Sequence, residues 1–277
     1  DSDINFDEFY LAKTIGFMFI KGQLKPVQVT KERYESFTTK AGVFYDKEQS
    51  LRDELSLLTE YLNNTISSIE DKPQEWFDII QILARAKALS LKCRSNNSDA
   101  DLSHIESRIN ERFQLFLEAS YDSLISRSGS KHPYLVTRVL EYMRYHPSGK
   151  KALIILDGLA YWQWLVITEA LEKESISSEQ KSTFAWIPTI TAWSRQAIFK
   201  GDVPELDESN TNEEKHFRAY WRSHGYSEHQ VEFIKIGVNK SIDLSDINSR
   251  SIIAFVINDL DDLMHGVLMG DEQLYLS

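Results

Sequence analysis

The sequence is poor in the residue that covalent cross-links and many metal sites need. It holds one cysteine, Cys93, among 277 residues. A single thiol excludes a disulfide framework and a cysteine-based zinc site. Because Cys93 lies on a stretch with a helical pattern between basic residues, we expect it to pack and to take no part in chemistry.

Long apolar segments are also missing. No stretch approaches the roughly 18 consecutive apolar residues of a membrane-spanning helix, and no charged-then-apolar leader is present. These features predict a soluble, cytoplasmic protein without a membrane partner. A loop of the form G-x-x-x-x-G-K-[ST] is absent as well, which argues against a P-loop nucleotidase.

Negative charge is concentrated in the second half of the chain. The formal net charge is −11, and residues 151–277 carry 11 Lys and Arg against 20 Asp and Glu. So acidic a region is a poor electrostatic match for a nucleic-acid backbone. Solubility is one explanation of these carboxylates, and the other is that some of them face bound cations.

The first half has the periodicity of amphipathic helices. In the first of them, apolar residues recur at steps of three and four at Leu55, Leu58, Leu62, Ile66 and Ile69. Further helices are expected from Pro73, from a capping box at Ser103 and Glu106, and from Pro133. We therefore predict a helical domain over residues 1–149.

After the linker Pro147-Ser148-Gly149, the pattern changes to short apolar runs. Such runs are typical of strands buried on both faces of a parallel sheet. We expect strands at residues 152–156, 184–187 and 252–257, with helical segments after them. Strands that alternate with helices predict an α/β layer fold over residues 150–277. In such sheets the ligand lies beyond the carboxyl ends of the strands.

Asp157 follows the first expected strand and is itself followed by Gly158. A carboxylate at this place reaches the ligand crevice, and glycine lets a ligand or metal approach closely. Asp-Gly is also a common turn pair, so a turn or a helix cap is the alternative. A phosphatase with an aspartyl nucleophile would show Asp-x-Asp here, and this chain does not.

The segment after the second expected strand opens a helix around Thr191. A hydroxyl at a helix N-terminus lies beside backbone N–H groups that can hold phosphate oxygens. Ser194 and Arg195, three and four residues later, share its helix face. Threonine is a weak nucleophile unless a metal or a base activates it. Simple capping of the helix by these hydroxyls is the alternative.

The third expected strand leads into a run of acidic residues. Asp261 and His265 are four residues apart, so a helical turn would project both side chains to one side. Such a pair suits zinc or manganese. One Asp/His pair is weak evidence by itself, and an ordinary acidic helix start is the alternative.

Together these segments resemble the PglZ domain, which belongs to the alkaline phosphatase superfamily and occurs in BREX-type bacterial defence systems against phage. The resemblance rests on the order and spacing of residues 151–164, 184–204 and 257–266. It implies an α + α/β chain, in which a helical domain precedes the first part of an alkaline-phosphatase-like α/β/α sandwich. The Ser-Arg-Gln and Asp-Asp-Leu-Met-His runs favour a type 3 BREX relative.

The resemblance also implies metal-dependent hydrolysis of phosphoric esters. Thr191 would be the nucleophile, and Asp157 would bind one metal ion together with it. Asp261 and His265 would hold a second ion, so two divalent ions, zinc or manganese, are expected in the full-length protein. The phosphate contacts implied in the same way are Ser194 and Arg195.

One departure from the family pattern affects this expectation. The family has a later strand that ends in a Ser/Thr-Asp-His-Gly motif, and nothing after His265 supplies it. We therefore expect a fragment of a longer protein, with a naturally truncated copy as the alternative. The 277-residue piece is expected to be inactive and to bind little or no metal.

The resemblance implies other proteins of the defence system as partners, with nucleic acid or a nucleotide as a candidate substrate. The alternative function is a catalytically inactive platform on which other defence proteins assemble. A surface or lid helix is expected to carry Glu213, Glu214, His216 and Trp221.

Overall fold

The computed structural model describes residues 9–37, 42–93, 96–126, 132–205, 212–237, 247–266 and 271–276. Contacts between residues divide the chain into two compact units. The first comprises Asp1–Phe116 and Tyr161–Ser177, and the second comprises Leu117–Ala160 and Ser178–Ser277. The domain boundary expected between residues 149 and 150 stays a prediction, and the contact units are divided at other places.

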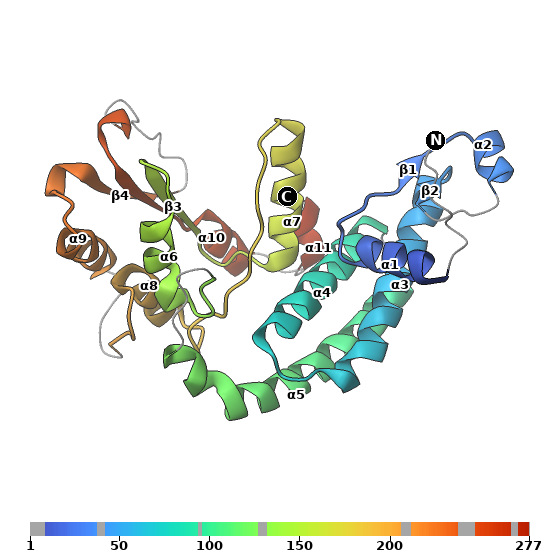
Figure 1. The fold of residues 1–277 in the computed structure, drawn as a ribbon, viewed down its shortest axis with the longest axis horizontal. Helices are drawn as coiled ribbons and strands as arrows, with labels where there is room; N and C mark the ends of the chain where they lie inside the picture. The colour runs from blue at the N-terminus through green and yellow to red at the C-terminus, as the bar shows by residue number, and fades with distance from the viewer. Residues whose placement is uncertain are drawn as a thin grey trace. The chain divides into compact units, whose positions relative to one another are not determined.

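The first unit is helical. Its helices are α1 (Phe9–Ile20), α2 (Lys31–Ser36), α3 (Lys47–Thr65), α4 (Pro73–Cys93), the first part of α5 (Asn96–Ser126), and α7 (Tyr161–Lys173). Two short strands, β1 (Val27–Gln28) and β2 (Val43–Phe44), pair in parallel, and a 3-10 turn, η1 (Ile66–Ser68), follows α3. Helices α3 and α4 lie alongside each other (Figure 1).

Apolar stripes hold these helices together. The stripe expected on α3 is confirmed by the buried side chains of Leu55, Leu58 and Leu62. The helix expected from Pro73 also begins there, and Trp76 packs edge-on against Phe113 with ring centroids 4.9 Å apart. The capping box expected at Ser103 is wrong, because α5 is already helical before that residue.

Helix α7 packs along α4 in the first unit. An ion pair of 2.7 Å joins Lys92 of α4 to Glu169 of α7, and an exposed pair of the same length joins Lys25, which precedes β1, to Glu172. Although α7 comes after the first strand of the second unit in the sequence, it packs on a helix of the first unit. Among the described residues, no helix is long and apolar enough to cross a membrane.

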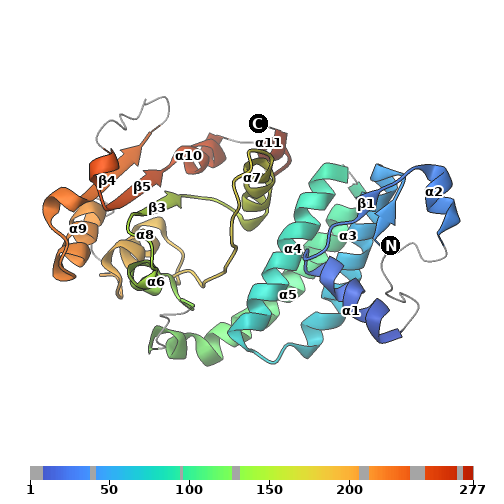
Figure 2. The ribbon, with the colours of Figure 1, turned by 45° about the horizontal axis from the view of Figure 1, so that its top comes forward.

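A three-stranded parallel sheet is the centre of the second unit (Figure 2). β5 (Ile252–Ile257) lies between β3 (Lys151–Leu156) and β4 (Val231–Ile236). Ile257 pairs with Leu156 on one side and with Ile236 on the other. The three strands therefore end level at their carboxyl ends.

Helices α6 (Val139–Tyr145), α8 (Thr191–Lys200) and α9 (Glu213–Ser223) pack on one face of this sheet. The buried cluster between helices and sheet consists of Leu140, Phe199, Phe217, Trp221, Val231, Phe233, Ile252, Ala254 and Val256. The described part of the unit also contains the last part of α5, η2 (Val136–Arg138), η4 (Glu228–Gln230), η5 (Ile247–Ser249), α10 (Asp259–Gly266) and α11 (Asp271–Leu276). Figure 1 shows α10 leading away from the sheet.

The structure confirms the strands expected at 152–156 and 252–257. The strand expected at 184–187 is wrong, because the only pairing described there is a single bridge between Phe184 and Leu135. The third strand of the sheet is instead β4, which the sequence analysis missed. The helix expected from Pro133 begins only at η2.

The mixture of helices with small parallel sheets agrees with the expected fold class at a coarse level. One face of the sheet has its helical layer, as an α/β/α sandwich requires. On β3 the side chain of Ile154 is 57% exposed. Within the described part of the second unit, no helix forms a second layer over it.

Candidate functional site

The carboxyl ends of β3 and β5 meet at one edge of the sheet. Because the two strands pair in parallel as far as Leu156 and Ile257, Asp157 and Asn258 follow them side by side. The backbone N–H of Asp157 donates to the carbonyl oxygen of Ile257 at 3.0 Å, which extends the pairing by one residue. Ligands lie at this edge in parallel α/β sheets.

Gly158 lets the start of α10 approach the loop after β3. Its φ of +72° lies in the left-handed region that favours glycine. A Cβ atom at this position would lie 3.2 Å from the Cα of Asp261 and 3.3 Å from the sulfur of Met264. The structure thus places the backbone of Asp261 next to the loop that carries Asp157.

Arg195 reaches this edge from α8 and is buried. Its Nη1 donates to Oδ2 of Asp157 at 2.7 Å and to Oδ1 of Asn258 at 3.0 Å. Its Nε donates to Oε1 of Glu213 at 2.5 Å. One guanidinium therefore joins the ends of β3 and β5 to α9.

Glu213 is the second acid at this guanidinium, and its side chain is 1% exposed. Its other oxygen, Oε2, lies 3.0 Å from Nζ of Lys235 on β4, although this contact does not have hydrogen-bond geometry. The two groups still form an ion pair, because charge attraction does not depend on that geometry. Asp157 and Glu213 are thus balanced by Arg195 and Lys235.

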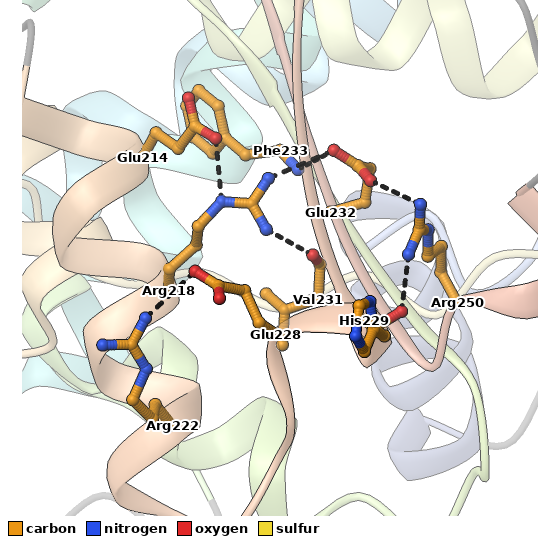
Figure 3. Close-up of polar contacts among 9 residues, drawn as sticks. All are labelled: Glu214, Arg218, Arg222, Glu228, His229, Val231, Glu232, Phe233 and Arg250. Atoms are coloured by element: carbon orange, nitrogen blue, oxygen red, sulfur yellow. Dashed lines mark hydrogen bonds and ion pairs between the residues drawn. The ribbon is translucent and has the colours of Figure 1, made fainter.

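Helix α9, which carries Glu213, is fixed to β4 by a second polar network (Figure 3). The Arg218 guanidinium donates to the Val231 carbonyl oxygen at 2.5 Å and to Glu214 at 2.8 Å. Glu232 on β4 lies between Arg218 and Arg250, at 3.2 and 3.3 Å. This network holds the helix that presents Glu213 to the site.

The surroundings of Arg195 stabilise its charged form. Burial acts to lower the pKa of this guanidinium, since it disfavours the charged form. The hydrogen bond and charge of Glu213, followed by those of Asp157, outweigh burial, so the pKa of Arg195 is raised. Arg195 is therefore a permanent cation in this site.

Thr191 is the first residue of α8, one helical turn before Arg195. The residue before it, Ile190, has no side-chain acceptor to cap the helix. The Ser194 hydroxyl donates to the Trp186 carbonyl oxygen at 3.4 Å. Ser194 and Arg195 thus already bond to protein groups, and their expected contacts with phosphate stay predictions.

The described residues do not fit the expected two-metal site in this arrangement. Both oxygens of Asp157 already accept hydrogen bonds, one from Arg195 and the other from the backbone N–H of Gly158 at 3.1 Å. Within the described part of the chain, no three His, Cys, Asp or Glu side chains converge to hold a metal ion. Asp259 has one buried carboxylate oxygen without a hydrogen-bond partner. The side chain of His265, an expected ligand, lies outside the described residues.

Comparison with known protein families assigns the second half of the chain to a family. Residues 136–274 match the family model of the BREX system PglZ alkaline phosphatase-like domain. The chain belongs to the PglZ family. A comparison with curated proteins finds no match.

Membership of the PglZ family implies a role in phage defence and partners within the BREX system. Alkaline-phosphatase-like folds generally use divalent metals. The roles expected for Asp157, Thr191, Asp261 and His265 stay predictions. The PglZ match begins at residue 136, inside the stretch that the sequence analysis assigned to the helical domain.

Sequence reasoning missed three residues of this site, which are Glu213, Lys235 and Asn258. The surface helix expected to carry Glu213, Glu214, His216 and Trp221 is α9, on which Glu214 is exposed whereas the side chains of Glu213 and Trp221 are buried. One sequence signal was available for α9, since Phe217 and Trp221 are four residues apart and form an apolar stripe. No comparable signal pairs Glu213 with Arg195, which lies 18 residues away.

Proposed function

We propose that this PglZ domain belongs to a phosphoric ester hydrolase of phage defence, a phosphatase or phosphodiesterase, with Thr191 as its nucleophile. Asp157, Asp261 and His265 belong to the proposal as ligands of divalent metal ions, zinc or manganese, in the complete protein. The described residues alone do not form that metal site, so the proposal assigns no catalytic step to it.

The observation that carries the proposal is the position of the first turn of α8. Arg195, one turn after Thr191, bonds to the residues that follow β3 and β5, so the helix begins near the ligand edge of the sheet. Ile190 cannot cap the helix, and the first N–H groups of α8 are donors suited to phosphate oxygens. A hydroxyl at this place suits attack on phosphorus.

The charge of the domain limits the substrate. Residues 151–277 carry 11 basic against 20 acidic residues, which disfavours a broad nucleic-acid surface. A nucleotide or another small phosphoric ester is therefore the substrate class that the domain suits best. A nuclease activity would need a basic surface from elsewhere, such as a partner protein.

The alternative is an inactive platform for other defence proteins. The hydrogen bond between Arg195 and Asp157 favours this alternative, because it engages a carboxylate that catalysis would need. The two functions differ in what a change at Thr191 does. An enzyme loses turnover, whereas a platform keeps its partners and has no turnover to lose.

The test is hydrolysis of bis(4-nitrophenyl) phosphate by the complete protein with Zn²⁺ or Mn²⁺. We expect nitrophenol release by the wild type and its loss in Thr191→Ala. Thr189→Ala is the matched control, because Thr189 is an exposed residue before α8, and this variant should keep the activity. Unchanged turnover in Thr191→Ala would overturn the nucleophile assignment. A wild type without turnover on phosphomonoesters, diesters and DNA, yet bound to BREX proteins, would favour the platform.

A further inference from the structure

Arg195 stands where a cation would be expected beside Asp157. Its guanidinium bonds to a carboxylate at the end of β3, an amide at the end of β5 and a buried carboxylate on α9. The side chain of Arg195 is 6% exposed and that of Asp157 is 14% exposed. The contact is therefore largely shielded from solvent.

We propose that Arg195 is the resident counter-cation of Asp157 and keeps divalent metal ions off that carboxylate until the guanidinium is displaced. The proposal rests on the proposed function in one respect, because it concerns the Asp157 carboxylate that the proposed function assigns to a metal ion. It predicts metal binding, which can be measured without turnover.

Two features make the guanidinium an effective competitor. Oδ2 of Asp157 accepts from Arg195 and Oδ1 accepts from Gly158, so a metal ion must replace at least one of these bonds. A hydrogen bond between charged groups is also among the stronger interactions in proteins. A metal ion that must first displace Arg195 from Asp157 should therefore bind about tenfold or more weakly than one that meets a free carboxylate.

The neighbouring charges hold Arg195 in place. Asp157 and Glu213 are balanced by Arg195 and Lys235. If a divalent ion displaced the guanidinium from Asp157, Arg195 would remain tied to Glu213 close to that ion, and like charges would repel. Removing Arg195 takes away both the competing bond and this repulsion.

The experiment titrates the 277-residue chain with Mn²⁺ alone and follows free Mn²⁺ by electron paramagnetic resonance. We expect weak binding by the wild type and at least about tenfold tighter binding by Arg195→Met. The double variant Arg195→Met with Asp157→Asn should lose the gain. Arg222→Met, which removes an exposed cation of α9, is the matched control for net charge and should bind like the wild type.

Two results would overturn the proposal. One is an Arg195→Met chain that binds Mn²⁺ no more tightly than the wild type. The other is a wild type that already binds tightly through Asp157, shown by loss of binding in Asp157→Asn. If Arg195→Met does not fold, Arg195→Met with Glu213→Gln removes both members of the buried pair, and the same two criteria apply to it.

Discussion

Arg195 and Asp157 are 38 residues apart in the sequence and are joined by a hydrogen bond of 2.7 Å from Nη1 to Oδ2. The bond ties α8 to the carboxyl end of β3. Because Thr191 lies on the first turn of the same helix, its position depends on this bond. The pair therefore links the stability of the second unit to the geometry of its candidate site.

Replacing Arg195 with methionine should destabilise the second unit strongly. The change leaves the buried Glu213 carboxylate with only the partly exposed Lys235 as a charge partner. Removing one member of a buried ion pair costs about 3–5 kcal/mol. Urea unfolding followed by circular dichroism measures the loss.

Arg222→Met is the matched control for this prediction. Arg222 and Glu228 form an exposed pair at 3.2 Å, and such pairs contribute about 0–1 kcal/mol. Similar losses for Arg195→Met and Arg222→Met would contradict a structural role for the buried network. Adding Glu213→Gln to Arg195→Met should restore part of the stability, because the uncompensated buried charge is then gone.

Gly158→Ala should also destabilise the second unit. The left-handed φ of +72° costs a residue with a side chain about 1–2 kcal/mol, and the new Cβ would press on the backbone of Asp261. Gly149→Ala is the control, since a Cβ there meets nothing within 4 Å and should change stability by at most about 0.5 kcal/mol. Thermal unfolding compares the two, and equal melting temperatures would refute the close packing of α10 on this loop.

Tyr121 anchors the segment that leads to Thr191. Its hydroxyl donates to the Ala185 carbonyl oxygen at 3.1 Å and accepts from the Ile187 N–H at 2.8 Å. Tyr121→Phe removes both hydrogen bonds, of which the one to the exposed Ala185 can be replaced by water, and should cost about 0.5–1.5 kcal/mol in urea unfolding. Tyr45→Phe, at an exposed side chain, should stay within about 0.5 kcal/mol of the wild type.

The same side chain should make stability depend on alkaline pH. Burial raises the pKa of Tyr121, although the hydrogen bond from Ile187 opposes the change. The folded state thus keeps the phenolic proton where the unfolded chain has lost it. The resulting stability is present below the unfolded pKa of about 10 and is lost as pH rises through the folded pKa. Thermal unfolding between about pH 9 and about pH 11 should show a shallower decline in Tyr121→Phe than in the wild type, and parallel declines would contradict this.

Periodicity and residue order in the sequence predict much of this fold. Apolar runs identified β3 and β5 because these strands are largely apolar along their whole length. β4 was missed because Glu232 and Lys235 interrupt its apolar residues. The run at 184–187 is equally apolar, but Phe184 and Trp186 are buried without joining the sheet.

The candidate site was predictable only in part. Asp157 could be proposed because it follows an apolar strand, and Thr191 because it begins a helix. The role of Arg195 could not, because its partners Glu213 and Asn258 come from separate segments that only folding brings together. A buried ion pair forms only when packing brings its two residues together. The types and spacing of Arg195 and Glu213 in the sequence do not indicate it.

The most direct test of the central claim is detection of a phosphoryl group on Thr191. The complete protein is mixed with bis(4-nitrophenyl) phosphate and Mn²⁺, quenched in acid within the first turnover, digested, and analysed by mass spectrometry. In the proposed function Thr191 attacks phosphorus and one nitrophenolate leaves, which predicts a 4-nitrophenyl phosphodiester on Thr191 that is absent from Thr191→Ala and unaffected by Thr189→Ala. Substrate turnover with the modification on Thr189 or Ser194, or on no residue of this segment, would contradict it.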